Sequence, residues 1–434
     1  TEGLKFRGLA SVRTYAENEN KRSYNPFYYG TAELETEEGL LYYLYQISEG
    51  TEYLNSPEIN NYSNSNFYYE FTTEYNRIFE EKHEVGGLLV FNFSESLNTI
   101  SGSSDFASLP SRNMGLSGRF SYNFDSRYYA EFNFGYNGSE KFAEDNRFGF
   151  FPSVGFGWIA SNEKWFEEMN SSITLLKFKI TNGKVGNDAI SSASDRFFYL
   201  SDVNLNYGDN GYSWGLDYNN YTSGYLIDRY SNPNVTWEVA EKTNFGLELE
   251  INKALNLQVD YFTEHRTQIY MERNYIPESM GLTTGISSNL GEVKSKGIDA
   301  SMDYNQAFSS GLYITGRANF TYATNEIILN GDPIYEFDNL SRIGYPVNQP
   351  FGLIAERLFI DAEDIANSPE QFNGFSSSSN AYLPGDIKYT DLNGDGVVNE
   401  NDMTAIGSPH VPEIIYGFGI SAGYRDFDLS IFMQ

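Results

Sequence analysis

The sequence has no cysteine, only 13 prolines among its 434 residues, and about half as many basic as acidic side chains. Without cysteine the chain forms no disulfide framework and no thiolate metal site. The 29 Lys and Arg against 59 Asp and Glu leave a net charge of −30. That balance argues against a nucleic-acid partner, which requires a positive face. No run approaches the ~18 consecutive apolar residues of a membrane-spanning helix, so a helical membrane protein is excluded.

Aromatic residues and glycine are abundant instead, with 35 Tyr, 33 Phe and 39 Gly. Two classes fit this composition. One is a secreted soluble all-β protein, and the other is a bacterial outer-membrane β-barrel, whose mean hydropathy stays low because each strand presents only every second residue to lipid. The chain starts at Thr1-Glu2 without a basic and then apolar leader, so we expect any secretion signal to have been removed or to lie outside it.

Apolar and polar residues alternate along many segments, which predicts β-strands. One such segment has its apolar positions at Met114, Leu116, Gly118, Phe120, Tyr122 and Phe124. Similar alternation covers residues 4–13, 128–137, 255–261, 298–304 and 312–322. These runs reach roughly 10–14 residues, closer to tilted transmembrane strands than to the ~5–6 residues of globular strands. With an aromatic face and an Arg-, Lys-, Asp- and Asn-bearing face, the pattern predicts an all-β fold, a transmembrane antiparallel β-barrel.

The connections are of two lengths. Tight links occur at Phe124–Arg127, Glu80–Lys82 and Asn252–Ala254, whereas long polar stretches occupy Ser48–Asn66, Asp188–Asn232, Asn330–Asn348 and Asp361–Pro412. Short turns on one side and long loops on the other are typical of such barrels, and the long loops are extracellular. The alternations predict roughly fourteen to sixteen strands. The run Ser376–Ser379 is predicted to be a low-complexity loop.

Several motifs then follow one another along the chain. They are Tyr24–Tyr29, Arg147–Trp158 followed by a helical stretch around Glu163–Glu168, Leu176–Lys179, Gly183–Asn187, Asn232–Glu238, Asn289–Ile298, Pro384–Tyr389, Asp391–Gly396 and Ile406–Pro409. Their order and spacing resemble the SusC/RagA branch of TonB-dependent outer-membrane transporters from Bacteroidetes. The resemblance extends over nearly the whole chain and rests on many separate motifs.

This resemblance implies a barrel of 22 strands with an N-terminal plug in the bacterial outer membrane, in contact with membrane lipid and LPS. It also implies a SusD-like surface lipoprotein over the extracellular mouth, and oligosaccharide or oligopeptide substrates. Family members are about twice as long as this chain. We therefore expect residues 1–434 to be one partial barrel domain without the plug and the final strands, with the TonB complex acting through a segment not in this chain.

A calcium-type motif lies within the long predicted loop 361–412. Its oxygen-bearing residues have the spacing of an EF-hand loop, with a Gly at the position of the sharp turn. The candidate ligands are Asp391, Asn393, Asp395, Val397 through its backbone carbonyl, and Asp402. Position 12 is Asp instead of Glu, as in dockerin-type loops. The spacing predicts a structural Ca²⁺ ion, and the alternative is a polar turn without an ion.

The remaining candidate residues show no catalytic or metal-binding pattern. His83, His265 and His410 have no metal-binding spacing, and the chain has neither a Gly-x-Ser-x-Gly elbow nor a Cys nucleophile. A lumen wall is predicted from Arg7, Arg13, Arg119, Arg317, Asp299 and Asp303, which in the family would meet plug and solute, or else form salt bridges between strands. Loop aromatics available to a sugar or a lipoprotein are Tyr207, Tyr212, Trp214, Tyr218 and Tyr221.

The leading functional hypothesis is TonB-dependent import of large nutrients, without covalent catalysis. The alternative is a secreted or surface calcium-stabilised β-rich binding or adhesion protein that does not transport. Nothing in the sequence favours an enzyme. Dependence on detergent separates the first two classes, since an adhesin would stay soluble without it.

Overall fold

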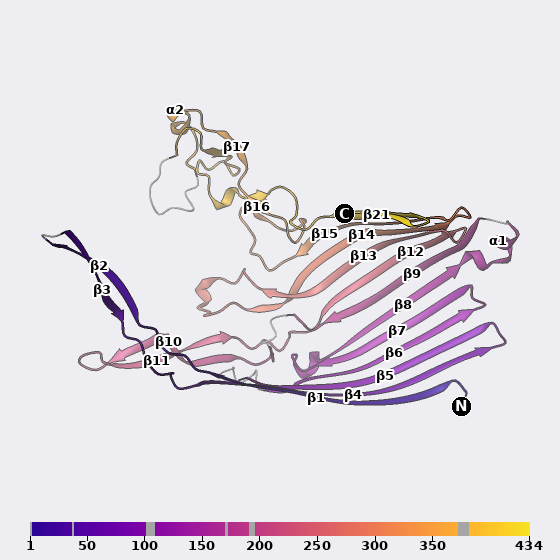
Figure 1. Ribbon diagram of the computed structural model, residues 1–434, viewed down its shortest axis with the longest axis horizontal. Coiled ribbons are helices and arrows are strands. Elements are labelled where there is room, and N and C mark those ends of the chain that lie inside the picture. The colour runs from indigo at the N-terminus through magenta and orange to yellow at the C-terminus, as the bar shows by residue number, and fades with distance from the viewer. Residues whose placement is uncertain (1, 37–38, 101–108, 170–171, 191–195, 372–381) are drawn as a thin grey trace. The chain divides into compact units, whose positions relative to one another are not determined.

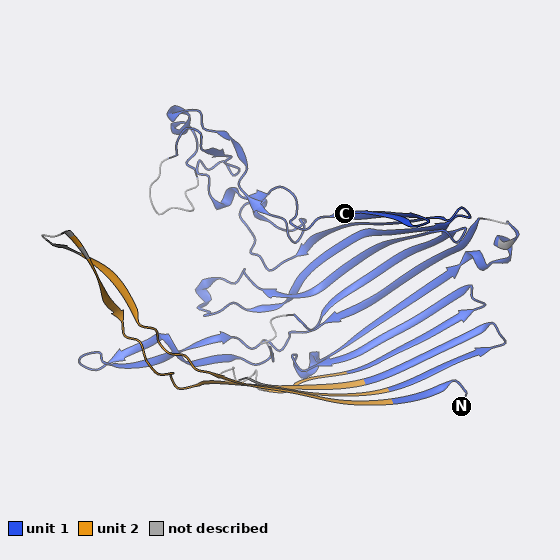
Figure 2. Cartoon of the chain, in the orientation of Figure 1, with its two compact units in different colours: residues 1–7, 72–91, 115–434 blue, residues 8–71, 92–114 orange. Residues whose placement is uncertain are grey.

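The computed structural model describes residues 2–36, 39–100, 109–169, 172–190, 196–371 and 382–434. The chain divides into two compact units, of which unit 1 comprises residues 1–7, 72–91 and 115–434 and unit 2 comprises residues 8–71 and 92–114 (Figure 2). The sequence-based prediction of one partial barrel domain is not tested by this division and stays a prediction.

Long antiparallel strands dominate the structure (Figure 1). In the described residues thirteen strands form one sheet in the order β1-β4-β5-β6-β7-β8-β9-β12-β13-β14-β15-β20-β21. Their bounds are β1 Leu4–Lys21, β4 Glu58–Phe79, β5 His83–Ile100, β6 Ser111–Phe124, β7 Tyr128–Ser139, β8 Phe148–Ile159, β9 Ile173–Asn187, β12 Glu238–Ile251, β13 Leu255–Glu272, β14 Ser287–Ala307, β15 Leu312–Leu329, β20 Ile414–Tyr424 and β21 Phe427–Met433. The all-β prediction is confirmed.

The three predicted tight links are hairpin turns. Each has two consecutive residues with positive φ, at Glu80-Glu81, Asp125-Ser126 and Asn252-Lys253. In the second, the Arg127 amide donates to the Phe124 carbonyl over 3.0 Å. Left-handed pairs of this kind follow the right-handed twist of the flanking strands, which is why they connect adjacent strands so tightly.

Unit 2 contains the distal parts of β1, β4, β5 and β6 and one hairpin. The hairpin pairs β2 (Tyr28–Thr36) with β3 (Gly39–Ser48), for example Ala32 opposite Tyr43. Strand β4 begins at Glu58, so the last part of the predicted loop Ser48–Asn66 is strand. The regular alternation of the neighbouring segments did not reveal this part because residues 58–66 are almost entirely polar.

The other long connections carry small elements of their own. Predicted loop Asp188–Asn232 contains a hairpin, and predicted loop Asp361–Pro412 holds short pieces. In these two loops lie β10 Asp202–Trp214, β11 Asn220–Arg229, α2 Ala362–Ala366, β18 Ile387–Tyr389, the 3₁₀ turn η6 Glu400–Asp402 and β19 Thr404–Ala405. The 3₁₀ turn η5 Asp338–Leu340 lies in predicted loop Asn330–Asn348, and the 3₁₀ turn η4 Glu278–Met280 and strands β16 Phe351–Gly352 and β17 Ala355–Leu358 lie outside the predicted loops. Residues 372–381, including Ser376–Ser379, lie outside the described residues. The principal sheet has fewer strands than the fourteen to sixteen expected, since hairpins β2–β3 and β10–β11 pair only with themselves.

Short helical turns also follow strands β7 and β8. They are η2 Glu144–Asn146, η3 Ala160–Asn162 and α1 Lys164–Glu168, and the last confirms the helical stretch expected around Glu163–Glu168. Among the described residues, no helix has the length and apolar character needed to cross a membrane.

The buried core is small and lies beside the strand ends. Phe142, Phe198, Val235 and Trp237 pack together, with the Phe142 and Trp237 ring centroids 5.5 Å apart. This cluster ties the β7–β8 connection to the segments around hairpin β10–β11. Most described side chains of the principal sheet are half-buried or exposed, and they lie on one or the other of its two faces.

Candidate functional site

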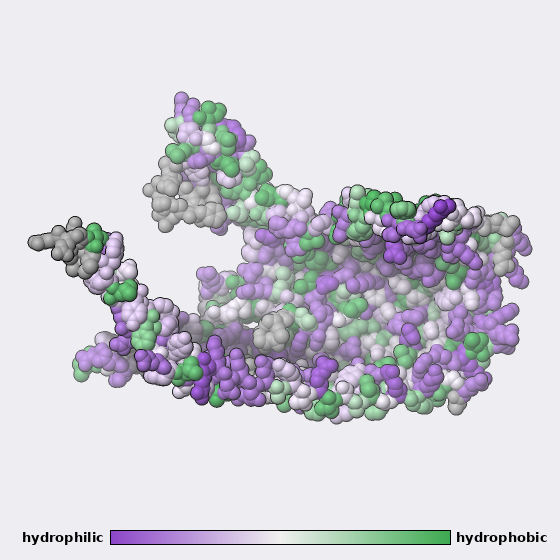
Figure 3. Space-filling view, viewed as in Figure 1, coloured by the Kyte–Doolittle hydropathy of each residue, from purple (hydrophilic) through white to green (hydrophobic). Residues whose placement is uncertain are grey.

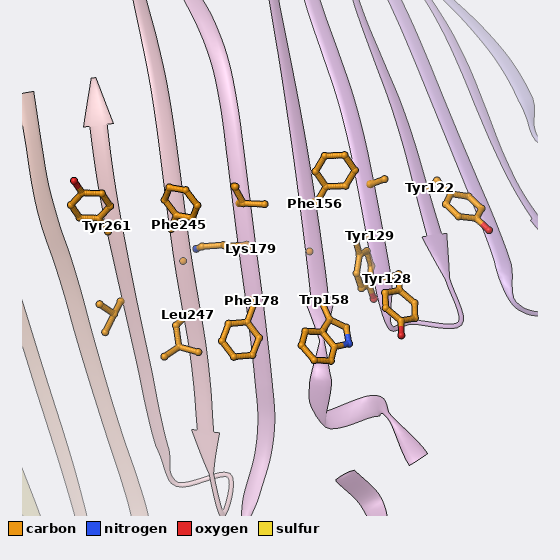
Figure 4. Close-up of a pocket in the computed structure, with 15 residues that line it drawn as sticks. Tyr122, Tyr128, Tyr129, Phe156, Trp158, Phe178, Lys179, Phe245, Leu247 and Tyr261 are labelled. Atoms are coloured by element: carbon orange, nitrogen blue, oxygen red, sulfur yellow. The ribbon is translucent and has the colours of Figure 1, made fainter. Parts of the chain in front are cut away.

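One face of the sheet in unit 1 is apolar, and the strand register arranges it in four rows. Directly paired residues share a face, and alternate residues of a strand return to it. The rows are Phe156, Ile180, Phe245, Tyr261, Ile298 and Tyr322; then Trp158, Phe178, Leu247, Val259, Ala300 and Phe320; then Leu176, Leu249, Leu257, Met302 and Ala318; then Ile173, Ile251, Leu255 and Tyr304. Figure 4 shows members of the first two rows standing side by side on neighbouring strands. We call this the apolar band.

The apolar band is exposed although it consists of large apolar side chains. Phe245 is 49% exposed, and Tyr261, Ile298 and Tyr322 are each at least 40% exposed. Six residue steps along a strand span ~20 Å, which approaches the ~25 Å apolar height of an outer-membrane barrel. Figure 3 shows further apolar side chains at the surface over β20–β21, where Leu429 and Ile431 are exposed. An exposed patch of this size requires an apolar environment.

The opposite face is polar and carries a charge cluster that joins three strands. Lys179 on β9 lies directly opposite Gly246, and Gly246 lies opposite Asp260 on β13. The lysine Nζ reaches across the glycine to the Asp260 carboxylate at 3.1 Å. Glu248 accepts a second contact from Lys179 at 3.3 Å and one from Lys177 at 3.1 Å. Figure 4 shows Lys179 extending from its strand toward β12.

Glycine at position 246 makes this crossing possible. A Cβ there would lie 2.0 Å from the Lys179 Cε and 2.4 Å from the Asp260 Oδ1. Asp260 also accepts a hydrogen bond of 2.7 Å from the Gln258 side chain. The cluster therefore fixes side chains from β9, β12 and β13 on the polar face.

The predicted lumen wall is assembled only in part. Arg317 lies opposite Asp303 and contacts it at 3.3 Å, and Asp299 shares their face directly opposite Asp260. Arg7 and Arg119 are exposed on β1 and β6, and Arg13 is exposed in unit 2. The Lys179–Asp260 cluster was not singled out from the sequence. The alternation in Leu176–Lys179 is a signal that puts Lys177 and Lys179 on one face, but their partners follow only from the register.

A second polar cluster lies farther along the same face, toward the long loops. Arg266 contacts Glu238 at 2.8 Å and Glu264 at 2.9 Å, and Lys242 contacts Glu264 at 3.1 Å. Two of the three histidines without metal-binding spacing have neighbouring side chains as partners. His83 Nδ1 lies 2.7 Å from the Tyr122 hydroxyl, and His265 Nε2 lies 3.3 Å from the Glu292 carboxylate. The polar face thus offers both charges and hydrogen-bonding groups to whatever fills the space beside it.

The loop aromatics lie on hairpin β10–β11 and its turn. Tyr212, Trp214, Tyr218 and Tyr221 are each more than half exposed. The Tyr212 and Trp214 rings meet edge to face with their centroids 4.8 Å apart. Their exposure leaves ring faces open to a further molecule.

An ion pair fastens the segment that follows β17. Arg357 grips the Asp364 carboxylate with both terminal nitrogens, one of them at 2.7 Å, and the Ile360 amide donates to the same carboxylate at 3.1 Å. The guanidinium, followed by the amide, holds the pKa of the Asp364 carboxyl well below its usual range. The carboxylate therefore stays charged, and the Arg357–Asp364 ion pair stays formed, throughout the neutral pH range.

The calcium-type loop is held by its own backbone. Asp391 accepts amide hydrogen bonds from Gly394 at 2.7 Å and Gly396 at 2.8 Å, and both glycines have positive φ. Asp402 is fully buried and accepts from the Leu392, Asn393 and Asn399 amides. The Asp395 Oδ2 accepts from the Asn393 side chain at 3.0 Å, and the Val397 amide donates to the Asp395 Oδ1.

The candidate ligands thus share one loop, but backbone N–H groups occupy much of their oxygen capacity. The described residues contain no group of three or more His, Asp or Glu side chains arranged to hold a metal ion. These backbone donors relieve the repulsion between neighbouring carboxylates, which a bound cation would otherwise do. Calcium binding stays a prediction from the motif.

Calcium binding is testable by thermal unfolding of the whole protein in calcium and in chelator. If the motif binds, calcium at 100 times the dissociation constant stabilises the folded state by about 2.7 kcal/mol. Asp395→Asn removes a candidate ligand charge and is expected to abolish this increment, while Asp386→Asn outside the motif retains it. Equal melting temperatures in millimolar calcium and chelator would rule the ion out.

No known protein-family profile matches the chain. Among curated proteins it is 25% identical to TonB-dependent receptor P3 of Formosa agariphila over 330 residues, which are 73% of this chain and 31% of the relative. It is 24% identical to TonB-dependent receptor P39 of the same organism, over 87% of this chain and 40% of the relative. It is 23% identical to TonB-dependent receptor SusC of Bacteroides thetaiotaomicron, over 73% of this chain and 30% of the relative.

Solved structures decide the fold. The RagAB peptide importer in its closed-closed state matches with a TM-score of 0.67 and 21% identity, over 100% of this chain and 45% of that one. Its open-open state matches with a TM-score of 0.68 and 19% identity over the same shares. The fold is that of a TonB-dependent outer-membrane transporter barrel. The resemblance to SusC/RagA transporters and the location in the outer membrane are confirmed.

In a transporter barrel of this kind, the exterior of the sheet is apolar and the interior is polar. The apolar band meets lipid, and the polar face lines the interior. The chain spans about a third of the length of the curated relatives it matches, up to 40% in the case of P39. These relatives are receptors and transporters, which agrees with a non-enzymatic role.

Proposed function

We propose that the chain forms part of the wall of a TonB-dependent importer that carries oligosaccharides or oligopeptides across the outer membrane. The observation that supports this proposal is the two-faced sheet, which follows the RagA-type barrel over its full length here. The interior face supplies charges and amides in place of a dry core, as a solute pathway requires. Energy comes from the TonB complex.

A SusD-like surface lipoprotein is the proposed partner at the long-loop end. The exposed rings of hairpin β10–β11, including Tyr212 and Trp214, offer the aromatic surface typical of protein interfaces. Aromatic faces also stack on sugar rings. The structural relative in its closed-closed and open-open states is a peptide importer, which supports an oligopeptide as one of the two proposed substrate classes.

Uptake measurements test this proposal in the bacterium that makes the protein. Deletion of the gene is expected to abolish uptake of a labelled oligopeptide or oligosaccharide, and the intact gene restores it. Because TonB-dependent import uses the proton-motive force, an uncoupler should stop uptake while surface binding continues. Unchanged uptake combined with loss of attachment to surfaces would contradict import and favour the adhesion protein.

A further inference from the structure

A row of polar side chains borders the apolar band on its long-loop side. Each member lies two residues beyond the first row of the band on the same face, and directly paired residues connect the members across the sheet. They are Asn182, Thr243, Thr263, Lys296 and Thr324, on β9, β12, β13, β14 and β15. We call these five residues the interface row. It contains one cation, three hydroxyls and no carboxylate.

A cavity of about 690 Å³ opens over this row. Lys294 and Lys296 line it together with Thr243, Thr263 and Thr324. Both lysines are exposed. Across the described ranges neither lysine takes part in an ion pair. Two ammonium groups are therefore available to an anion.

The acidic residues around the cavity are either engaged or more distant from the band. Glu264 is neutralised by Lys242 and Arg266. Glu241 and Glu326 lie one row farther out, where they face Lys184 and Lys294 across the strands. The Glu241 carboxylate accepts a hydrogen bond of 3.5 Å from the Asn182 side chain, at the β9 end of the interface row. That row is ~7 Å beyond the interface row along the strand. On β13, β14 and β15, an anionic group at the level of Lys296 thus meets the ammonium group and the hydroxyls of Thr263 and Thr324 first.

We infer that the interface row and Lys294 bind the phosphorylated headgroup of a lipid in the outer leaflet. The threonines on both sides of Lys296 supply hydroxyl donors for phosphate oxygens, and the lysines supply charge. The apolar band begins directly below, at Phe245, Tyr261 and Tyr322, so the acyl chains of the same molecule can lie along it. This continuity distinguishes a lipid from a soluble phosphate. The inference rests on the fold and its membrane location and does not depend on transport.

The position of the site follows from the connections. Turns at Glu80-Glu81, Asp125-Ser126 and Asn252-Lys253 mark one end of the sheet. The long connections leave the other end, which in such barrels is the exterior. The interface row lies between the band and that end, at the level of lipid headgroups. A headgroup there anchors four adjacent strands through contacts with β12, β13, β14 and β15.

Binding of fluorescent lipid A to the whole protein in detergent micelles tests the inference. Lys296→Gln is expected to raise the dissociation constant about fivefold, because the attraction between one lysine and an anionic lipid surface strengthens binding by about that factor. Lys294→Gln together with Lys296→Gln should raise it roughly 20-fold. Lys253→Gln, in the turn at the opposite end of the sheet, is the matched control and should leave the constant unchanged.

Dephosphorylated lipid A completes the design. The wild-type protein should bind it as weakly as the double variant binds the phosphorylated lipid, and millimolar inorganic phosphate should not displace lipid A. Equal affinity for both lipids, an equal loss in Lys253→Gln, or full displacement by free phosphate would overturn the inference. Folding of each variant is checked by its heat-dependent mobility shift on gels.

Discussion

Leu247→Arg is expected to destabilise the protein folded in a lipid bilayer by about 2–4 kcal/mol, the cost of an arginine near the middle of a barrel's lipid-facing surface. Leu247 occupies the second of the four rows of the apolar band, between Phe178 and Val259 on the neighbouring strands. Lipid tails offer no hydrogen bonds to a guanidinium. The cost arises because the side chain must either be buried charged or bend toward the headgroups.

Thr243→Arg is the matched control for this substitution, on the same strand and face but in the interface row. There the cost falls to about 0–1 kcal/mol, because an arginine reaches headgroups and water. Folding into phospholipid vesicles across a urea gradient, followed by the gel mobility shift, measures both variants. Equal costs at the two depths would contradict the assignment of this face to lipid.

Lys179→Met is expected to destabilise the folded protein by about 2–4 kcal/mol, since it leaves the Asp260 carboxylate without its cation. The Asp260 side chain is 12% exposed and that of Lys179 is 26% exposed, so water compensates only in part. Asp299, directly opposite Asp260, adds a second negative charge. Within the described part of the chain, the Gln258 amide then remains as the side-chain hydrogen-bond donor to Asp260.

Two further variants show whether this loss comes from the unpaired carboxylate. Asp260→Asn in the Lys179→Met background should recover most of the stability, because an amide needs no cation. Lys177→Met removes a more exposed lysine, and its partner Glu248 still contacts Lys179 in this variant. We therefore expect a loss of folding stability below about 1 kcal/mol. Urea unfolding in vesicles gives the free energy of unfolding for the wild type and the three variants. A loss that persists in the double variant would mean that Lys179 acts by packing.

The alternation of residues was sufficient to predict the main features of the fold. Segments such as Met114–Phe124 have period two over lengths that suit a membrane strand, and the local chemistry of Asp125-Ser126 and Asn252-Lys253 permits left-handed turns. These are properties of neighbouring residues. The short helix near Glu163 was predicted from family resemblance and found at Lys164–Glu168.

Long-range pairing could not be predicted in the same way. Lys179 and Asp260 are separated by 81 residues, and their contact depends on the register of two strand pairs and on the missing side chain at Gly246. Hairpin β10–β11 was predicted as loop because its alternation is broken by Asn, Gly and Asp and by register shifts. The calcium motif was recognisable from spacing, yet backbone N–H groups compete for its oxygens.

The two faces of the sheet are expected to have different surroundings, lipid on the apolar band and water on the polar face. Because the chain has no cysteine, single cysteines can be introduced along β12 and labelled one at a time. Quenching by brominated lipid should be strong at positions 245, 247 and 249, whereas quenching by aqueous iodide should be strong at positions 244, 248 and 250. Uniform quenching along the strand, or the reverse pattern, would contradict this assignment of the two faces.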